Sequence, residues 1–271
     1  MAMAIEVQLG EWSRPILLSH GAPTKRVFVL LHGFTASPPQ FAEFGRRLYE
    51  RGANVLIPLL PGHGHADRMT EALSELPNEE LIQFAHATIV EARAHGENVV
   101  VVGFSLGGLL GLWLAQNARL ERVVAIAPFL GVGFIPAILS EWATDLVLRL
   151  PNRFLFWDPF QRERLQPQHG YPRYPTHAIA RLTRLSRRVV NEARTRPPKT
   201  REIVLVMNAS EISVSNRSIR RLARILHEYP EVHVTTHRLR GLPLSHDIIE
   251  PLRAPKIVER IYPELIDLAD R

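Results

Sequence analysis

The chain has 271 residues, no cysteine and a formal net charge of +6. This length suits one sizeable α/β domain with an insertion and is short for two domains. The lack of cysteine excludes disulfides, a thiolate nucleophile and a cysteine-bound metal. Apolar residues make up 46% and charged residues 22% of the chain, so a filled core is expected and disorder is not.

The basic residues are almost all arginines and are spread along the chain, with one modest cluster at 181–188. Leu182 and Leu185 recur in this cluster at helical spacing, which is typical of a helix with a solvated basic face, so no nucleic-acid partner is expected. No signal peptide is predicted, and residues 99–115 fit a strand, a turn and a buried helix better than a membrane span. We expect a cytoplasmic protein without stable membrane insertion, and its oligomeric state stays open.

Short apolar runs alternate with helical patterns along most of the chain. Strands are predicted at 26–32, 54–60, 98–104, 122–128, 202–208 and 231–239. Most of these runs are continuously apolar, which is typical of strands covered on both faces in a parallel sheet. Residues 37–52 form a predicted helix with Ser37 as its cap and a buried stripe of Phe41, Phe44 and Leu48, and a second helix is predicted near 106–117. Repeated β-α units of this length imply a parallel sheet with right-handed crossovers.

The regular alternation stops between about 130 and 195. An amphipathic helix is predicted within 135–151, residues 152–175 are rich in proline and aromatics without a clear period, and another helix covers 176–193. Such long segments inside compact domains usually have a function. We interpret 131–195 as an inserted, mainly helical cap, and 1–130 with 196–271 as the core. The alternative is an ordinary long connection containing two helices.

A single serine lies at the junction of the most apolar strand and the following helix. Residues 103–107 read Gly-Phe-Ser-Leu-Gly and fit the pattern G-x-S-x-G, in which a tight turn strains the backbone of the serine. The helix that begins there directs free N–H groups and its dipole at the same spot. The pattern and its placement predict that Ser105 is a nucleophile.

A serine hydroxyl needs a base, and the base needs an orienting carboxylate. His246 lies in a loop before the final helix and is the candidate base, the alternative being a histidine that caps that helix. Asp247 is expected to be the cap instead, since an adjacent residue cannot easily place a carboxylate on the far ring nitrogen. Glu211, the one carboxylate directly after the fifth predicted strand, is the candidate acid. Asp145 and Asp158 compete, but they precede the return to the sheet.

Acyl transfer also needs two N–H donors for the oxyanion that forms. The backbone amide of Leu106, directly after the candidate nucleophile, is one candidate. The backbone amide of Phe34, in the loop after the first strand, is the other, and Gly33 lets this loop pass close to the substrate. His32 is expected to be a structural histidine bonded to nearby backbone.

Four stretches, in this order, resemble the α/β-hydrolase superfamily. They are FVLLHGF at 28–34, PLLPGHG at 58–64, VVGFSLGG at 101–108 and SHD at 245–247. The group most similar in these stretches is that of carboxylesterases and monoacylglycerol-lipase-like serine hydrolases, and the resemblance covers most of the chain outside the cap.

This resemblance implies an α/β fold with a mostly parallel central sheet of about six to eight strands flanked by helices. It also implies a triad of Ser105, Glu211 and His246, an oxyanion hole formed by the amides of Phe34 and Leu106, and no cofactor. One departure concerns the acid, because the family more often has aspartate at the position of Glu211.

Residues 63–67 allow a different interpretation. His63, His65 and Asp67 form a His-x-His-x-Asp pattern, which begins the metal site of metallo-β-lactamases and would indicate a two-metal hydrolase. That motif continues with a further histidine, whereas this chain has Arg68. The PGHG portion also occurs in serine hydrolases, so no metal is predicted.

The favoured interpretation is an ester hydrolase of the carboxylesterase or lipase type, acting on small-molecule or lipid-like esters with apolar acyl groups. Phe129, Phe134, Trp142 and Trp157 are the candidate substrate-binding residues, while other aromatics fill the core of the cap. A thioesterase, a peptidase and a C–C hydrolase remain alternatives within the same fold, as does a binding module that has lost catalysis.

Overall fold

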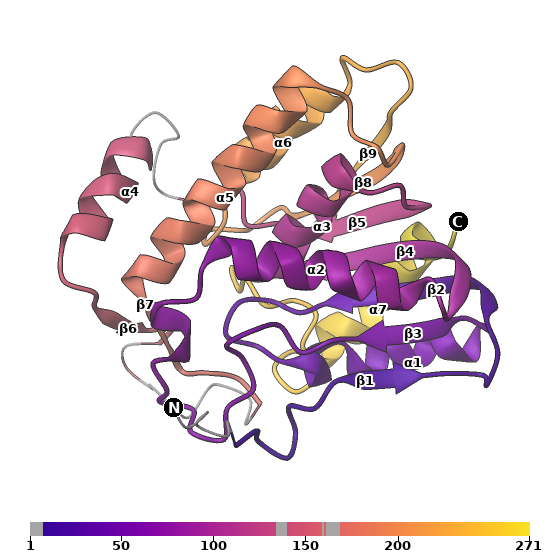
Figure 1. The fold of residues 1–271 in the computed structure, drawn as a ribbon, viewed down its shortest axis with the longest axis horizontal. Coiled ribbons are helices and arrows are strands. Elements are labelled where there is room, and N and C mark those ends of the chain that lie inside the picture. The colour runs from indigo at the N-terminus through magenta and orange to yellow at the C-terminus, as the bar shows by residue number, and fades with distance from the viewer. Residues whose placement is uncertain (1–7, 134–139, 159, 161–168) are drawn as a thin grey trace, which may run out of the picture.

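A sheet of seven strands forms the centre of the protein (Figure 1). The computed structural model describes residues 8–133, 140–158, 160 and 169–271. The strand order is β1-β3-β2-β4-β5-β8-β9, and only the β1–β3 pair is antiparallel among the described pairs of this sheet. The strands are β1 (Ile16–Leu18), β2 (Thr24–Leu31), β3 (Asn54–Ile57), β4 (Gly96–Phe104), β5 (Arg122–Ile126), β8 (Glu202–Asn208) and β9 (His233–Leu239). The predicted α/β fold with a mostly parallel sheet is confirmed.

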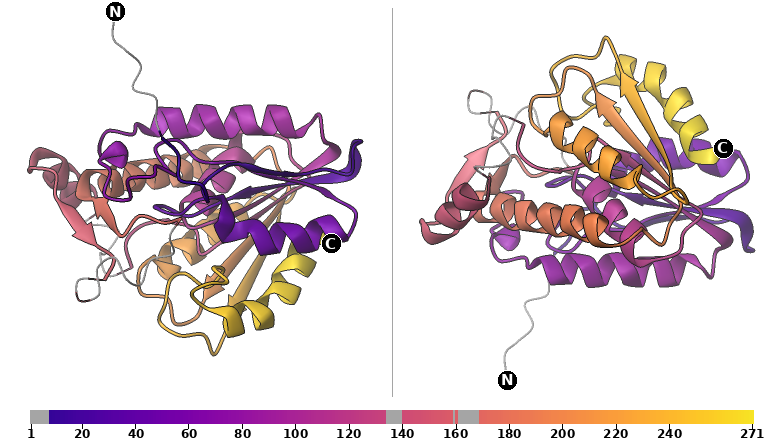
Figure 2. Two further views of the ribbon diagram at one scale, coloured as in Figure 1. Left: turned by 90° about the horizontal axis from the view of Figure 1, so that it is seen from below. Right: turned by 90° about the horizontal axis from the view of Figure 1, so that it is seen from above.

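Helices cover both faces of this sheet (Figure 2). One face carries α1 (Ala42–Glu50) and α7 (Pro255–Asp270), which pack against each other. The other face carries α2, α3, α5 and α6, which contact one another in sequence across the sheet. Their bounds are Asn78–Ala92, Leu106–Asn117, Thr176–Thr195 and Asn216–Leu226. Short 3-10 helices, η1 (Pro38–Phe41) and η2 (Ala72–Ser74), complete the connections.

The central strand β4 and the helix α3 that follows it form the heart of the core. The valines of β4 at positions 99–102 are buried, and so is every residue of α3 from Leu106 to Gln116. Covering a strand on both faces and a helix on all sides removes this apolar surface from water, which is the main favourable contribution to folding. The apolar run around Ser105 is therefore the scaffold that fixes its position.

The helix predicted at 37–52 is present, but its start differs from the expectation. It begins as η1 and continues as α1, and its stripe of Phe41, Phe44 and Leu48 is fully buried as predicted. Ser37 does not cap it with its side chain. The Oγ of Ser37 instead donates to the carbonyl oxygen of His169, at 2.7 Å. Two prolines follow Ser37, so the first turn offers fewer N–H groups to a capping side chain.

The segment between β5 and β8 contains α4 (Ser140–Arg149), β6 (Phe154–Phe156), β7 (Arg173–Pro175) and α5. Strands β6 and β7 pair in an antiparallel ribbon, which the sequence did not predict. Each strand has only three residues, and β7 ends in a proline, so neither shows a period of alternating side chains. Strand β1, also three residues long, escaped prediction for the same reason.

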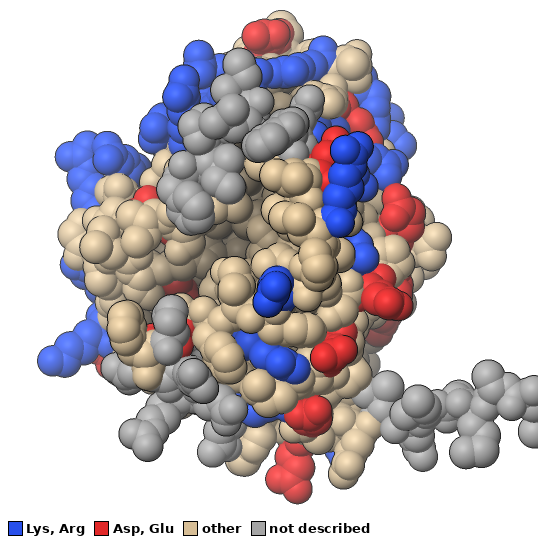
Figure 3. All heavy atoms as spheres, turned by 90° about the vertical axis from the view of Figure 1, so that its left-hand side faces the viewer, with Lys and Arg blue, Asp and Glu red and all other residues tan. Residues whose placement is uncertain are grey.

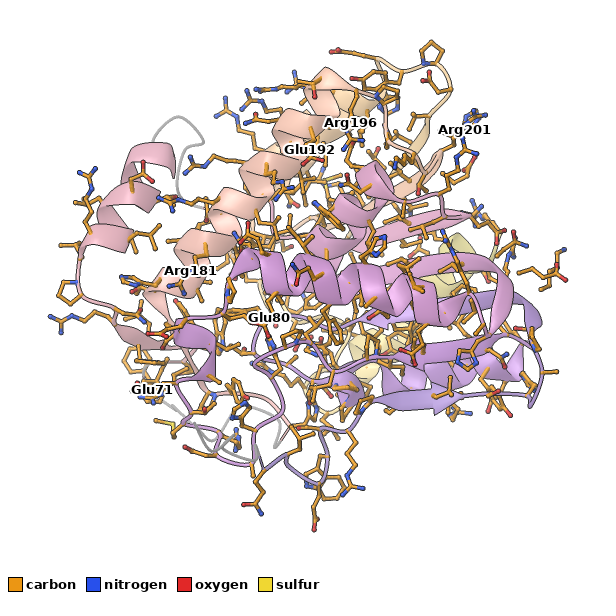
Figure 4. The ribbon with its side chains drawn as sticks, viewed as in Figure 1. Glu71, Glu80, Arg181, Glu192, Arg196 and Arg201 are labelled. Atoms are coloured by element: carbon orange, nitrogen blue, oxygen red, sulfur yellow. The ribbon has the colours of Figure 1, made fainter. Side chains whose placement is uncertain are left out.

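Helix α5 belongs both to this segment and to the layer over the sheet. It packs on α4 and also on α3 and α6. Figure 4 shows Arg181 near the η2 end of the helix, and Glu192 and Arg196 at its other end. Arg196 there donates to the carbonyl oxygen of Gln116 in α3, at 2.8 Å. The limits of the cap at 131–195 stay a prediction.

Candidate active site

Three of the predicted site residues follow three strands of the sheet at their carboxyl ends. Ser105 comes directly after β4, Glu211 lies in the loop after β8, and His246 lies in the loop after β9. The strands are parallel and neighbouring pairs connect β4, β5, β8 and β9, so these loops emerge at one edge. This edge is where α/β folds usually bind ligands.

The turn at Ser105 requires the glycines that flank it. Ser105 has a φ of +52°, in the left-handed region that residues other than glycine rarely adopt. A Cβ on Gly103 would overlap the carbonyl oxygen of Gly107, and a Cβ on Gly107 would overlap that of Leu31. The strained serine is held from both sides, because its N–H donates to Ile126 and its carbonyl oxygen accepts from Phe129, each at 3.0 Å.

The side chains of Ser105, His246 and Glu211 form one chain of short contacts. The Nε2 of His246 lies 2.9 Å from the Oγ of Ser105, and its Nδ1 lies 2.7 Å from the Oε2 of Glu211. The two ring nitrogens therefore face opposite partners, as a proton-transferring histidine requires. The structure brings together all three residues of the predicted triad.

The surroundings of Glu211 stabilise its carboxylate in the charged form. Its side chain is fully buried. Its Oε1 accepts a hydrogen bond from the backbone N–H of Ser213, at 2.6 Å, while Oε2 faces His246. Burial alone would raise the pKa of Glu211, but the contact with His246 and the backbone donors outweigh burial and hold this pKa below its usual value.

The loop after β2 presents the amide of Phe34 between two fixed neighbours. The N–H of Gly33 donates to the Oε1 of Gln40, at 2.8 Å, and the N–H of Thr35 donates to the Nε2 of His63, at 3.2 Å. Phe34 and Leu106 both line the cavity over Ser105. Leu106 is the first residue of α3, where helical N–H groups have no partner within the helix.

Two buried histidines support this loop. His32 is structural, as expected, because its Nε2 accepts from the N–H of Leu60 and its Nδ1 bonds the carbonyl oxygen of Gly33. Burial, and after it the nearby His63, lowers the pKa of His32. Burial also lowers the pKa of His63 to about 4.

The His-x-His-x-Asp pattern does not assemble into a metal centre. Both ring nitrogens of His63 are engaged in hydrogen bonds. Nε2 accepts from the N–H of Thr35, and Nδ1 bonds to the carbonyl oxygen of Pro61. Within the described part of the chain, no three His, Asp or Glu side chains are grouped closely enough to hold a metal ion.

A cavity of about 800 Å³ opens over Ser105, and Figure 3 shows a hollow on this face with mainly uncharged residues around it. Phe129 and Trp157, two predicted substrate-binding residues, line this cavity. Phe134 lies outside the described residues, and so does the side chain of Trp142. Many of the other lining side chains are aliphatic, among them Val132, Val147, Leu155, Ile179, Leu182, Ile212 and Leu244.

Residues of the cap segment hold the Phe34 loop at Thr35, a contact that the sequence did not predict. The Nε1 of Trp157 donates to the Oγ1 of Thr35, at 2.8 Å, and the N–H of Tyr171 donates to its carbonyl oxygen, at 2.7 Å. Thr35 has a φ of +64°, so its strained backbone is fixed by partners from two parts of the chain.

The expectation that Asp247 caps the final helix is wrong. Helix α7 begins only at Pro255, with Ala254 at its N-cap, so Asp247 is too far along the chain to reach its first turn. The side chain of Asp247 instead lies 3.2 Å from the Nε2 of Gln40 and 3.6 Å from a guanidinium nitrogen of Arg253.

Comparison with known proteins establishes the family. The model of the Alpha/beta hydrolase family matches residues 28–248. The chain belongs to this family. In this α/β hydrolase, the described residues contain no helix with both the length and the hydropathy of a membrane span.

Relatives of this α/β hydrolase carry esterase and lipase names. A Mycoplasma pneumoniae protein, provisionally named esterase/lipase 3, is 30% identical over 110 residues, which are 39% of this chain and 38% of the relative. The thermostable monoacylglycerol lipase of Bacillus sp. (strain H-257) is 25% identical over 129 residues, which are 44% of this chain and 50% of the relative. These alignments span half or less of each relative.

A solved structure shows the same fold over nearly the whole chain. The monoacylglycerol lipase of Paleococcus ferrophilus superposes with a TM-score of 0.69 and 20% identity, covering 94% of this chain and 98% of that one. At this identity the likeness concerns the fold of this α/β hydrolase.

Proposed function

We propose that this α/β hydrolase is a serine esterase that cleaves carboxylic esters with apolar acyl groups. The observation that carries the proposal is the contact chain from the Oγ of Ser105 through both ring nitrogens of His246 to Glu211. The names of the two curated relatives, an esterase/lipase and a monoacylglycerol lipase, support the same class of substrate.

The first half of the reaction forms an acyl-enzyme. The Oγ of Ser105 attacks the ester carbonyl carbon while the Nε2 of His246 takes the hydroxyl proton, and the charged Glu211 stabilises the resulting imidazolium. The amides of Phe34 and Leu106 donate to the oxyanion, and each such donor contributes roughly 10²- to 10³-fold to kcat in serine hydrolases. The tetrahedral intermediate then collapses, and His246 gives the proton to the departing alcohol.

The second half of the reaction releases the acid and restores the enzyme. A water molecule gives a proton to the Nε2 of His246 and attacks the acyl carbon, and the same two amides hold the oxyanion. The proton returns to the Oγ of Ser105 as the acid leaves. Every proton is thus carried by one ring nitrogen, and the chemistry uses only side chains, backbone amides and water.

The cavity supports esters with apolar acyl groups. Much of its lining is aliphatic or aromatic and offers no charged partner to an acyl chain. Burying each methylene of an apolar acyl chain there contributes about 0.8 kcal/mol to binding. Esters with medium and long acyl chains are therefore expected to bind more tightly than acetyl esters.

A fluorophosphonate reagent tests the nucleophile directly. We expect covalent labelling of the wild type and none of the Ser105→Ala variant, which should also lose the burst of p-nitrophenol during the first turnover. Metal chelators should leave turnover unchanged. Unlabelled wild-type protein with no turnover would favour a binding module, and turnover lost on chelation would favour the metal-dependent alternative.

A substrate panel tests the reaction type. p-Nitrophenyl esters of increasing chain length, a matched thioester and a matched amide should show the highest kcat/KM for the longer esters. A dominant rate on the thioester or the amide would contradict an esterase and move the assignment to a thioesterase or a peptidase.

A further inference from the structure

Gln40 is a buried polar residue that connects two loops of the candidate active site. It belongs to η1, lines the cavity and is only 1% exposed. Its Oε1 accepts a hydrogen bond from the N–H of Gly33, at 2.8 Å, and its Nε2 donates to the Oδ2 of Asp247, at 3.2 Å. Gly33 precedes Phe34, and Asp247 follows His246. The proposed reaction assigns no chemical step to Gln40.

The two partners fix the amide of Gln40 in one orientation. The N–H of Gly33 can only donate a hydrogen bond, and the ionised carboxylate of Asp247 can only accept one. The amide oxygen must therefore face Gly33 and the amide nitrogen must face Asp247, because the reverse orientation would oppose donor to donor and acceptor to acceptor. This place requires a side chain with an acceptor and a donor at its end, and an apolar side chain of the same length satisfies neither partner.

The bond to Gly33 fixes the direction of the Phe34 amide. A Cβ on Gly33 would come within 3.0 Å of the ring of Phe104, so the close approach favours glycine here. Glycine also gives the backbone more freedom than any other residue, and its torsion angles orient the next peptide, which carries the N–H of Phe34. The hydrogen bond to Gln40 removes this freedom on one side, while the N–H of Thr35 is held on the other side.

The contact with Asp247 acts on the loop that carries His246. This loop, residues 240–254, lies between β9 and α7 and contains no helix or strand. Side-chain contacts must therefore hold His246 in place. The Oδ2 of Asp247 is held from two sides, by the Nε2 of Gln40 and by a guanidinium nitrogen of Arg253 at 3.6 Å.

A second connection to the same loop begins next to η1. The Nε2 of His169 lies 3.2 Å from the Oε2 of Glu250, and both side chains are buried. The carbonyl oxygen of His169 accepts from the Oγ of Ser37, which directly precedes η1. This short stretch of chain thus contacts the Phe34 loop through Gln40 and supports the His246 loop through both Gln40 and Ser37.

We propose that Gln40 is a positioning residue that couples the amide of Phe34 to the imidazole of His246. This inference rests on the proposed esterase function. During acylation the Phe34 amide donates to the ester oxygen while His246 takes the proton of the hydroxyl that attacks the same carbonyl group. The two loops must therefore keep a constant spacing, to within about 0.5 Å for productive geometry. The oxyanion forms only as the reaction proceeds, so the contribution of Gln40 lies in the rate of acylation and not in substrate binding.

Gln40→Met tests this coupling in the full-length protein, because methionine keeps the length of the side chain but bonds neither loop. We expect single-turnover acylation by p-nitrophenyl octanoate to slow by about tenfold to a hundredfold, as small misplacements of catalytic groups do. The ester concentration at half-saturation should stay within about twofold of the wild type. An octyl trifluoromethyl ketone, which forms an oxyanion on Ser105, should bind more weakly by the same factor as the rate. Rates are expressed per Ser105 titrated with the fluorophosphonate reagent, so unfolded protein does not contribute.

Two further variants separate positioning from a general effect on the core. Gln116→Met makes the same change at a glutamine that is 2% exposed and lies at the other end of α3 from Ser105, so acylation should be unchanged. Gln40→Glu combined with Asp247→Asn exchanges donor and acceptor between the two positions. The new carboxylate accepts from the N–H of Gly33 and from the new amide, so acylation should recover to within about fivefold of the wild type.

The outcomes separate the positioning role from the esterase function. Wild-type acylation by Gln40→Met would overturn the positioning role, and so would a double variant as slow as Gln40→Met. An increased half-saturation concentration with an unchanged rate would show that Gln40 binds the substrate, and would overturn the role as well. The esterase function stands in each of these cases. Its own failure is recognised separately, by a wild-type Ser105 that the fluorophosphonate reagent does not label.

Discussion

At the scale of single residues, the unusual feature is a glutamate in the position proposed for the acid. Glu211 has one methylene more than aspartate, and the loop after β8 accommodates it by folding back. The backbone N–H groups of Ser213 and Val214 both point at Oε1, which leaves Oε2 for His246. The extra flexibility of a glutamate side chain is removed by these contacts and by complete burial of the side chain.

Glu211→Gln should lower kcat by roughly 10³- to 10⁴-fold, as removal of the orienting carboxylate does in other serine hydrolases. The amide keeps the size of the side chain but cannot stabilise an imidazolium. The measurement is single-turnover acylation with a p-nitrophenyl ester, and Glu211→Asp is the matched variant that keeps the charge. A Glu211→Gln enzyme with near wild-type acylation would place the acid elsewhere.

Much of this site could be predicted from the sequence, because its signals are local. The G-x-S-x-G turn, the HGF loop and the position of His246 after the last strand all depend on backbone constraints within a few residues. Gln40, Thr35, His169 and Glu250 could not be predicted, since their partners lie far along the chain. The hydrogen bond between Ser37 and His169 spans 132 residues, and neither residue type indicates such a partner.

At the scale of elements, the cap segment and the Phe34 loop hold each other in place. Trp157, just after β6, and Tyr171, before β7, both bond to Thr35, and the Trp157 ring also packs edge-on against Phe34 at a centroid distance of 6.4 Å. The amide proposed to hold the oxyanion thus belongs to a loop whose conformation depends on a distant segment.

Trp157→Phe should lower kcat by about fivefold to tenfold, because it keeps an aromatic ring but removes the hydrogen bond to Thr35. Thr35→Val removes the same bond from the other side, and the double variant should lose little more than either single one. Thr35→Ser keeps the hydroxyl and should retain most of the activity. Additive losses in the double variant would contradict coupling through this bond.

The elements themselves were predicted best where they are long and buried. The strand at 202–208 and the helix near 106–117 match β8 and α3, while the strand predicted at 54–60 ends at Ile57. Residues 58–60 are apolar, but they belong to the loop that approaches His32, so burial there does not indicate a strand. Tertiary contacts determine where such a strand ends, and a local sequence pattern does not reveal these contacts.

At the scale of the whole molecule, buried neutral histidines make stability depend on pH. An unfolded histidine titrates near 6.5, whereas His63 titrates at about 4 in the folded protein. Between these values the unfolded chain binds a proton that folded His63 does not, so the free energy of unfolding falls as the pH falls from 6.5 to 4. The contribution of His63 is on the order of 3 kcal/mol, and His32 acts in the same direction.

Urea unfolding at pH 6.5, 5.5 and 4.5 should therefore show a steady loss of stability. His63→Gln keeps an acceptor and a donor but does not titrate, so its free energy of unfolding should change less over this range. Asp247 works in the opposite direction, because burial and Glu250 raise its pKa. Equal slopes for the wild type and His63→Gln would show that His63 is protonated in the folded state.

The spacing of 105, 211 and 246 along the chain has a consequence for biosynthesis. The ribosome adds Ser105 to the chain long before His246, since the contact between the two side chains spans 141 residues. During that interval the hydroxyl has no base within reach and stays inert. In the proposed mechanism, Ser105 therefore becomes reactive only when β9 and the loop beyond it have docked on the sheet.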